Sequence, residues 1–285
     1  MRKTTKIWLV IAAFLTIGGL VMFTAVMSAC HWDFGSLSTV TYITTTQEIH
    51  ETFHSLSIDT VTADVTLVPS PDDKCRVEWI TEEHTDYAVT VQDGTLTVQY
   101  IDNRSDMDYI HHIGIYGGAP CITVYLPQAQ YQSLSVTAST GAIRAENLTA
   151  DTLALSVTTG RIAVSDVTCQ GTVTADVTTG KTSIANLQCK NLLSNGSTGD
   201  INMKNVTAAD SFSIQRTTGD VNLDRCDASE IYIKTTTGDV NGSLLSEKNF
   251  IAQTNTGDVT VPRIGSGGIC QIDTSTGDIH ITLVS

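Results

Sequence analysis

A Thr-Gly pair recurs through the second half of the chain at a nearly constant spacing. Successive pairs are 19 or 20 residues apart, and Ser, Thr or Asn precedes the Thr each time. A fixed period of this length is typical of proteins that stack one structural unit on the next. It predicts a repeat architecture over residues 133–285. The glycines are Gly141, Gly160, Gly180, Gly199, Gly219, Gly238, Gly257 and Gly277.

Apolar and polar residues alternate on both sides of each glycine. Phe212 and Ile214 precede Gly219 by seven and five residues, and Val221 follows it by two. Period-two alternation is typical of strands with one buried face, whereas a helix needs apolar residues three and four apart. Each repeat therefore predicts two short strands, with Ser194 as an exception to the apolar pattern. The glycine marks the corner, where a positive φ favours a residue without Cβ.

Strands that recur in identical columns can stack coil on coil, with about 4.8 Å between hydrogen-bonded neighbours. We therefore predict an all-β fold, a parallel β-solenoid of about eight coils of 19–20 residues each. One coil cannot bury its own apolar face, so the array is expected to fold as a unit.

Residues 31–132 lack the glycine repeat and predict a different β region that caps the N-terminal end of the solenoid. An uncapped end would expose an unpaired strand edge. Asp93-Gly94 between two alternating runs predicts a hairpin. The last coil, Asp278–Ser285, has no evident cap. The predicted strands are Val40–Thr46, Leu56–Val61, Val65–Val68, Arg76–Thr81, Tyr87–Gln92, Thr95–Ile101 and Cys121–Leu126.

Residues 1–30 contain an uncharged, mostly apolar run from Ile7 to Ala29, behind three basic residues. About 20 such residues cross a bilayer, and the basic end stays in the cytoplasm. We therefore predict one transmembrane helix in the cell membrane, with the C-terminal domain extracellular. Two alternatives stay open. Met27-Ser28-Ala29-Cys30 is similar to a lipobox, which predicts a lipoprotein anchored at Cys30, and cleavage would give a secreted form.

Charge and cysteine content narrow the function. Lys and Arg number 16 against 30 Asp and Glu, which gives a formal net charge of −14. Nucleic-acid binding needs clustered basic residues and is therefore not expected. The cysteines beyond Cys30 contain no C-x-x-C pair, so small buried residues are favoured over a zinc or redox site. Cys169 and Cys189 share a repeat position, and a disulfide between them stays open.

Five repeats carry an aspartate directly after the glycine, and stacked coils would place these carboxylates in a line. One interpretation is that each carboxylate accepts hydrogen bonds from turn N–H groups. The other is that the line collects Ca²⁺ or a cationic polymer, because like charges so close are costly unless bridged. No other cofactor is expected. The acidic ladder comprises Asp200, Asp220, Asp239, Asp258 and Asp278.

Most catalytic motifs are absent from the sequence. It contains no G-x-S-x-G, no P-loop of the form G-x-x-x-x-G-K-[ST] and no G-x-G-x-x-G pattern. His50-Glu51-Thr52-Phe53-His54 has the H-E-x-x-H spacing, but it lies between two predicted strands and not on the helix that this zinc motif requires. His111-His112 beside Asp106 and Asp108 forms either a weak metal cluster or a solvated polar loop. The short repeat spacing leaves no room for the long loops that would wall a polysaccharide cleft. We therefore expect no catalytic residues and no enzyme activity.

The repeats resemble those of a bacterial adhesin-like family of unknown function with TTGD or STGD repeats. The resemblance covers roughly residues 50–285. Ala142, Arg161 and Lys181 depart from it, because they replace the aspartate. The resemblance implies a β-solenoid that is surface-exposed and membrane-anchored, with a role in adhesion or envelope sensing and no catalytic residues. The matching stretches are Ser139-Thr140-Gly141, Thr158-Thr159-Gly160, Thr178-Thr179-Gly180, Ser197-Thr198-Gly199-Asp200, Thr217-Thr218-Gly219-Asp220, Thr236-Thr237-Gly238-Asp239, Asn255-Thr256-Gly257-Asp258 and Ser275-Thr276-Gly277-Asp278.

Two functions follow from the repeat and the anchor. The first is an adhesin or cell-envelope binding module, in which the side of the rod contacts a cell-wall glycan and weak contacts add up along the repeats. The second is a component of an envelope-stress or signalling system that docks an envelope protein. The uncapped coil Asp278–Ser285 would then accept a strand from that partner.

Overall fold

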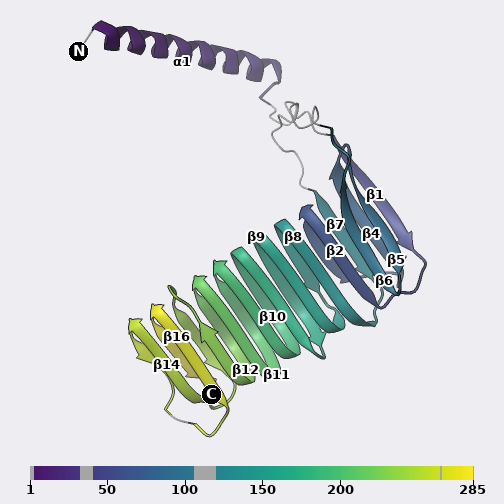
Figure 1. Cartoon of the computed structure of the whole chain (residues 1–285), viewed down its shortest axis with the longest axis vertical. Helices are drawn as coiled ribbons and strands as arrows, with labels where there is room; N and C mark the ends of the chain where they lie inside the picture. The colour runs from purple at the N-terminus through teal and green to yellow at the C-terminus, as the bar shows by residue number, and fades with distance from the viewer. Residues whose placement is uncertain (1–2, 33–40, 106–119, 264, 285) are drawn as a thin grey trace.

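The computed structural model describes residues 3–32, 41–105, 120–263 and 265–284 of the 285-residue chain. One helix, α1 (Lys3–Ala29), precedes an elongated stack of strands (Figure 1). Its segment Thr5–Ala29 is long and apolar enough to cross a membrane. The most apolar part of this segment is not covered by any other part of the described structure. A signal sequence has the same properties. Cys30, the residue of the lipoprotein alternative, directly follows the helix.

The strands of the N-terminal region match the predicted ones to within three residues at each end. They are β1 (Tyr42–Ile49), β2 (Ser55–Thr62), β3 (Asp64–Pro69), β4 (Cys75–Glu82), β5 (Thr85–Gln92), β6 (Thr95–Asp102) and β7 (Cys121–Leu126). The repeat region begins with long strands that continue around the corners, and these are β8 (Gln130–Glu146), β9 (Thr149–Cys169), β10 (Thr172–Thr198), β11 (Ile201–Thr218) and β12 (Val221–Lys234). The remaining strands are β13 (Val240–Leu244), β14 (Asn249–Thr256), β15 (Val259–Thr260), β16 (Ile269–Thr276) and β17 (Ile279–Leu283).

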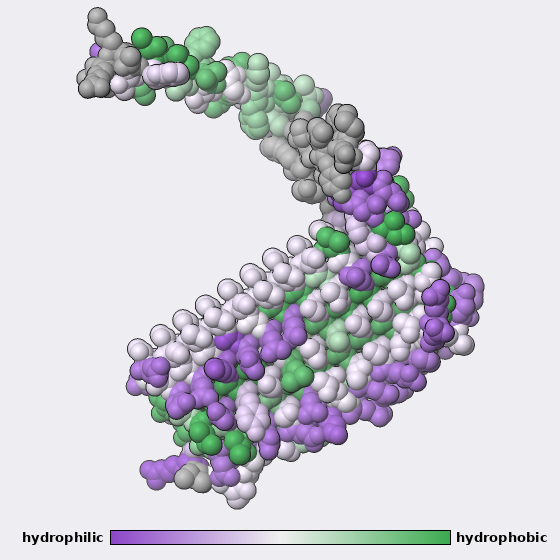
Figure 2. Space-filling view, in the orientation of Figure 1, coloured by the Kyte–Doolittle hydropathy of each residue, from purple (hydrophilic) through white to green (hydrophobic). Residues whose placement is uncertain are grey.

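Parallel, in-register pairing builds the stack. β8 to β12 pair in chain order, so that equivalent repeat positions lie side by side, such as Ile143 beside Ile162. The inward positions form one continuous core from Ile49 to Ile281. Figure 2 shows residues of like hydropathy in rows that follow the stack. The predicted parallel β-solenoid is thus confirmed.

The corner glycines stack directly on one another, as the repeat predicts. All eight have a positive φ, between 120° at Gly199 and 151° at Gly160. A Cβ on any of them would overlap or crowd backbone atoms of the adjacent coil; on Gly180 it would overlap the carbonyl oxygen of Gly160. The glycine is therefore required both by its φ and by the close approach of the coils.

A coil that the glycine repeat does not reveal lies beneath the first glycine. β2 and β3 pair in parallel with β8, with Leu56 beside Leu134 and Val65 beside Ile143. Its corner residue is Ala63, whose carbonyl oxygen packs against Gly141. Parallel stacking therefore begins well before residue 133.

The N-terminal end of the stack is covered by antiparallel strands. β6 and β7 lie outside β2 and β3 in parallel register. β5 then pairs antiparallel with β6, β4 with β7 and β1 with β4. The predicted hairpin is confirmed, because Asp93 and Gly94 at the β5–β6 turn both have a positive φ. The predicted cluster of Asp106, Asp108, His111 and His112 lies outside the described residues.

The coils at the C-terminal end do not follow chain order. β16 lies between β12 and β14, and β17 lies between β13 and β15. The expectation that Asp278–Ser285 forms the open end is therefore wrong. Ile272, Ile279 and Ile281 of this coil are buried. The more strongly apolar coil thus occupies the inner place, and β14 and β15 form the open end instead (Figure 1).

Candidate functional site

The acidic ladder is a continuous line of hydrogen-bonded aspartates. The backbone N–H of Asp220 donates to Oδ1 of Asp200 (3.0 Å), and that of Asp239 donates to Oδ1 of Asp220 (2.9 Å). The N–H of Asp278 then donates to Asp239, and that of Asp258 to Asp278, both at 2.8 Å. The line follows the order of the coils in the stack. Four of the five carboxylates therefore accept a turn N–H from the next coil.

The ladder has an earlier member that sequence reasoning missed. Oδ1 of Asp64 accepts a hydrogen bond from the backbone N–H of Ala142 at 2.8 Å, in the same geometry. The sequence pattern that could have identified it is Thr62-Ala63-Asp64, in which Ala63 stands where the repeat has glycine. Among the described residues, no group of three or more His, Cys, Asp or Glu side chains is placed to hold a metal ion. Ca²⁺ binding along the ladder stays a prediction.

Alanine substitutions at two ladder positions are expected to have unequal effects. Asp220→Ala leaves the half-buried N–H of Asp239 without its acceptor, which costs about 1–3 kcal/mol of unfolding free energy. The Asp258 carboxylate accepts no hydrogen bond from any described residue, so Asp258→Ala should cost less than about 0.5 kcal/mol. Urea unfolding of the two variants measures the difference. Equal losses would contradict a structural role for the ladder.

Arg216 is a charged side chain in the interior of the repeat region, where it is only 5% exposed. Its Nη1 donates to the carbonyl oxygens of Ser194 (3.2 Å) and Gln215 (2.9 Å), and its Nη2 donates to Oγ of Ser194 (2.9 Å) and Oγ1 of Thr182 (3.3 Å). No carboxylate of the described residues pairs with the guanidinium. Burial lowers the pKa of Arg216, and the charge of Asp176 opposes that effect.

Arg216 explains several departures from the repeat pattern. Thr182 and Ser194 replace apolar residues and supply acceptors for its guanidinium. Gly196 leaves the space that the guanidinium occupies, because a Cβ there would lie 2.9 Å from Nη1. The sequence does show polar or small residues at inward positions of three successive repeats. It does not show that these residues surround a single buried arginine.

A groove of about 500 Å³ runs along the outer surface just after the corners. Its lining crosses five coils, and the residue three after the glycine is Ala163, Ser183, Asn202, Asn222 and Asn241 in turn. Nδ2 of Asn222 donates to Oδ1 of Asn202 at 3.2 Å, so the amides form a short ladder. The smaller Ala163 and Ser183 continue the column beyond it.

The lining of this groove has no net charge. Its only two charged residues, Lys204 and Asp224, lie 3.9 Å apart across neighbouring coils. Ala163 and Ala185 contribute apolar surface, and the buried side chains of Val164, Ile184 and Met203 lie beneath it. The groove therefore offers amide and hydroxyl groups above an apolar floor, a combination typical of sites for uncharged polar ligands. Sequence reasoning missed it, although Asn recurs three residues after the glycine in three successive repeats.

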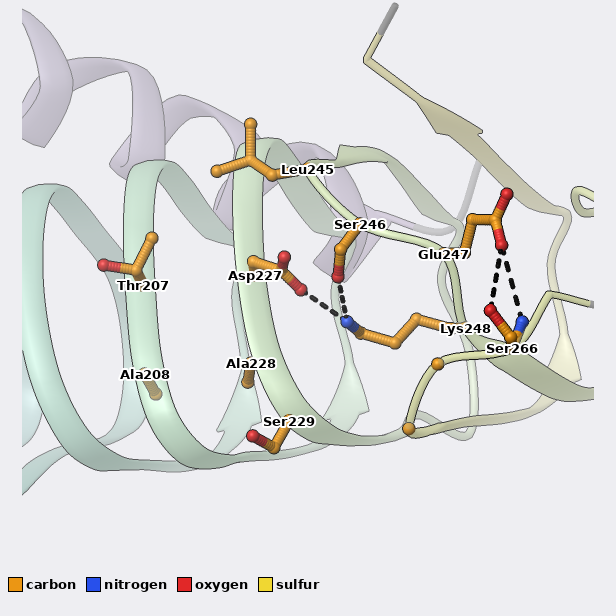
Figure 3. A pocket seen from close by; sticks show the side chains of 12 residues that line it. Thr207, Ala208, Asp227, Ala228, Ser229, Leu245, Ser246, Glu247, Lys248 and Ser266 are labelled. Carbon is orange, nitrogen blue, oxygen red and sulfur yellow. Dashed lines mark hydrogen bonds and ion pairs between the residues drawn. The ribbon is translucent and has the colours of Figure 1, made fainter.

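A second hollow, of about 630 Å³, lies where the chain crosses over at the C-terminal end (Figure 3). Lys248 is 4% exposed, and its Nζ lies 2.6 Å from Oδ1 of Asp227 and 2.5 Å from Oγ of Ser246. The ion pair with Asp227 and the contact with Ser246 fasten the crossover to β12.

All seven cysteines are free, including the stacked pair Cys169 and Cys189. Burial raises the pKa of Cys189 and of Cys270 to about 12, and that of Cys226 to about 11. Such thiols are uncharged at neutral pH and are poor nucleophiles and metal ligands. They fill space in the core, in agreement with the interpretation from spacing.

Comparison with known proteins supports the same architecture. The chain is similar to the structure of a candidate adhesin from Bacteroides fragilis NCTC 9343, with a TM-score of 0.50 and 16% identity over 86% of this chain and 97% of that one. A candidate lipid-binding protein from Parabacteroides distasonis ATCC 8503 has a TM-score of 0.49 and 14% identity over 85% and 97% of the two chains. At these identities the likeness concerns the fold alone. None of the curated proteins matches the chain.

A family profile described as Toastrack DUF4097 matches the chain twice, over residues 53–177 and residues 170–285. The two matches together cover all the strands from β2 to β17 and include all eight corner glycines. This is well over half of the sequence, and the chain therefore belongs to the Toastrack DUF4097 family.

Proposed function

We propose that the protein is a membrane-anchored, extracytoplasmic adhesin, a cell-envelope binding module without catalytic activity. Its ligand is a linear, uncharged cell-wall glycan that lies along the side of the rod. The observation that carries this proposal is the groove across five coils, from Ala163 to Asn241. Its columns repeat at the strand spacing, so a polymer of repeating units meets equivalent positions in successive coils, three of which carry Asn.

The chemistry of the groove supports a carbohydrate. Amide groups such as those of Asn222 and Asn241 donate to and accept from sugar hydroxyls. The apolar floor suits the C–H faces of the rings, and the Lys204–Asp224 pair adds no net charge. Each coil contributes little, and repetition supplies the affinity.

Helix α1 supports attachment to a membrane. Its segment Thr5–Ala29 is apolar, and the basic residues before it favour a cytoplasmic N-terminus, with the rod outside the cell.

Co-sedimentation with purified cell walls tests the proposal. Residues 41–285 are suitable, because the core extends from Ile49 to Ile281 and includes no residue of α1. We expect saturable binding that is insensitive to salt. Ser183→Trp fills the groove and should weaken binding at least about tenfold.

Ala154→Trp serves as the matched control, since Ala154 is an exposed residue of β9 that does not line the groove. It should bind as the unmodified protein does. No saturable binding, or equal losses in the two tryptophan variants, would contradict the proposal. Binding that needs Ca²⁺ and is lost when the ladder aspartates are changed to Asn would place the contact on the acidic ladder instead.

A further inference from the structure

The coil of β14 and β15 is weakly buried. No residue from 249 to 263 is buried, whereas the neighbouring coils each contribute several buried apolar residues. Val259 is 42% exposed, but Ile279, its partner in β17, is only 1% exposed. A segment with few buried apolar contacts opens locally at low free-energy cost. The coil of β14 and β15 therefore has the composition of a part that opens before the rest of the stack.

This coil is bonded to the stack on one side. β14 pairs only with β16, and β15 pairs only with β17, within the described part of the chain. Oγ1 of Thr254 adds a hydrogen bond to the carbonyl oxygen of Gly277 (2.9 Å). The N–H of Asp258 adds another, to Oδ1 of Asp278 (2.8 Å). β16, in contrast, pairs with both β12 and β14, so it is held from two sides.

The coil begins and ends at one fastened point. The N–H of Asn249 donates to the carbonyl oxygen of Gly268 (2.8 Å), and Nδ2 of Asn249 donates to that of Gly267 (2.7 Å). Just before Asn249, the buried Lys248 forms its ion pair with Asp227 of β12 (Figure 3). The chain thus leaves the stack and returns to it at the same place. The segment between can move without releasing the residues that follow it.

The C-terminal coil has an attachment to the stack that involves neither β14 nor β15. β16 pairs with β12, and β17 pairs with β13, so that Ile279 lies beside Val240 (Figure 1). The N–H of Asp278 also donates to Oδ1 of Asp239 at 2.8 Å. Residues at the end of the chain are therefore held independently of the exposed coil that precedes them in the sequence.

We propose that residues 250–263 form an end flap, which opens from the stack as a unit while β16 and β17 stay folded. Its hinge is the fastened point at Asn249 and Gly268. Opening uncovers the outer edge of β16 and β17 and frees Oδ1 of Asp278 from the N–H of Asp258. While the flap is closed, that edge is hidden. The groove ends at the coil of Asn241, so this motion is independent of glycan binding.

Hydrogen exchange of the full chain in detergent micelles, followed by mass spectrometry, tests the end flap. We expect the amides of β14 to exchange at least about 100-fold faster than those of β16. The amides of β16 should exchange as slowly as those of β12, because both strands are released only when the stack unfolds. Fraying from the C-terminus would produce the reverse order, with β16 and β17 exchanging before β14.

Two alanine variants separate the end flap from the rest of the stack. Thr254→Ala removes the hydrogen bond to Gly277 and should speed exchange in β14 about fivefold further, with the melting temperature unchanged. Thr282→Ala is the matched control. Its Oγ1 donates to the carbonyl oxygen of Gly242 at 3.2 Å, a bond of the same kind that joins β17 to β13. This variant should leave exchange in β14 unchanged.

Several outcomes would overturn the proposal. Equally fast exchange in β14 and β16 would mean that the two coils open together. Equally slow exchange in β12, β14 and β16 would mean that the stack opens only as a whole. If Thr282→Ala speeds exchange in β14 as much as Thr254→Ala does, the motion does not have its hinge at Asn249. None of these results bears on wall binding, which the co-sedimentation experiment tests separately.

Discussion

Gly180→Ala is expected to lower the free energy of unfolding by about 2–6 kcal/mol. Gly180 has a φ of 139°, a region in which alanine is strained by about 1–3 kcal/mol. The added Cβ also overlaps the carbonyl oxygen of Gly160 in the adjacent coil, and relief of that overlap costs about another 1–3 kcal/mol.

The neighbouring coils limit any relaxation at this position. Gly180 packs on Gly160 on one side and beneath Gly199 on the other, and both are corner glycines with a positive φ. A shift of one corner therefore disturbs the joints on both sides of the coil. The soluble fragment is expected to show a lower urea midpoint and increased aggregation.

Ala63 provides the matched control for this substitution. It occupies the corresponding corner in the coil of β2 and β3, and its φ is not positive. Ala63→Gly should therefore cost only the added freedom of the unfolded chain and the loss of one buried methyl group, together about 1–2 kcal/mol. Urea unfolding followed by circular dichroism measures both variants. A Gly180→Ala protein as stable as Ala63→Gly would show that the corner tolerates a side chain.

The regular part of the fold is predictable from sequence because it depends on local periodicities. Inward residues of a repeat, such as Phe212 and Ile214, are fully buried, as their alternate spacing from Gly219 predicts. The apolar run from Ile7 to Ala29 likewise lies within the one long helix. These features need only the period of the side chains and the conformational demands of glycine.

The order of the coils is not predictable in the same way. Each coil presents nearly the same faces to its neighbours, so the repeat identifies the coils without assigning their places in the stack. The last coil of the chain lies inside because its isoleucines gain more from full burial than Ala252 and Val259 do. The coil of Ala63 was missed for a different reason, since its corner residue lacks the glycine that defines the repeat.

The side-chain sites escaped prediction because they depend on contacts between coils. Thr182, Ser194 and Arg216 lie in three different repeats, and their hydrogen bonds follow only from the register of β10 and β11. The groove beside Asn202 is likewise formed by equivalent residues of several coils, so it exists only once the coils are stacked. The acidic ladder was foreseen as a line, but its hydrogen bonds to the next coil's N–H required the structure.

The double variant Thr182→Val/Ser194→Ala, with Arg216 kept, is expected to lose about 3–5 kcal/mol of unfolding free energy. Both side-chain acceptors of Nη2 are then gone, and the guanidinium remains inside the core. Each hydrogen bond to a charged group contributes about 1.5–3 kcal/mol. The cost of desolvating the cation is then no longer offset by hydrogen bonds. Removing the partners of a buried charge while the charge remains is strongly destabilising.

Adding Arg216→Met to that double variant should restore the stability to within about 1 kcal/mol of the unmodified protein, or above it. Methionine fills much of the space beside Gly196, and the triple variant leaves no charge and no unpaired hydroxyl in this part of the core. Urea unfolding at neutral pH compares the double and triple variants. The strong non-additivity is the diagnostic result, because two independent packing defects would instead add to a larger loss. If the triple variant is less stable than the double one, Arg216 stabilises the solenoid by packing that its hydrogen bonds do not explain.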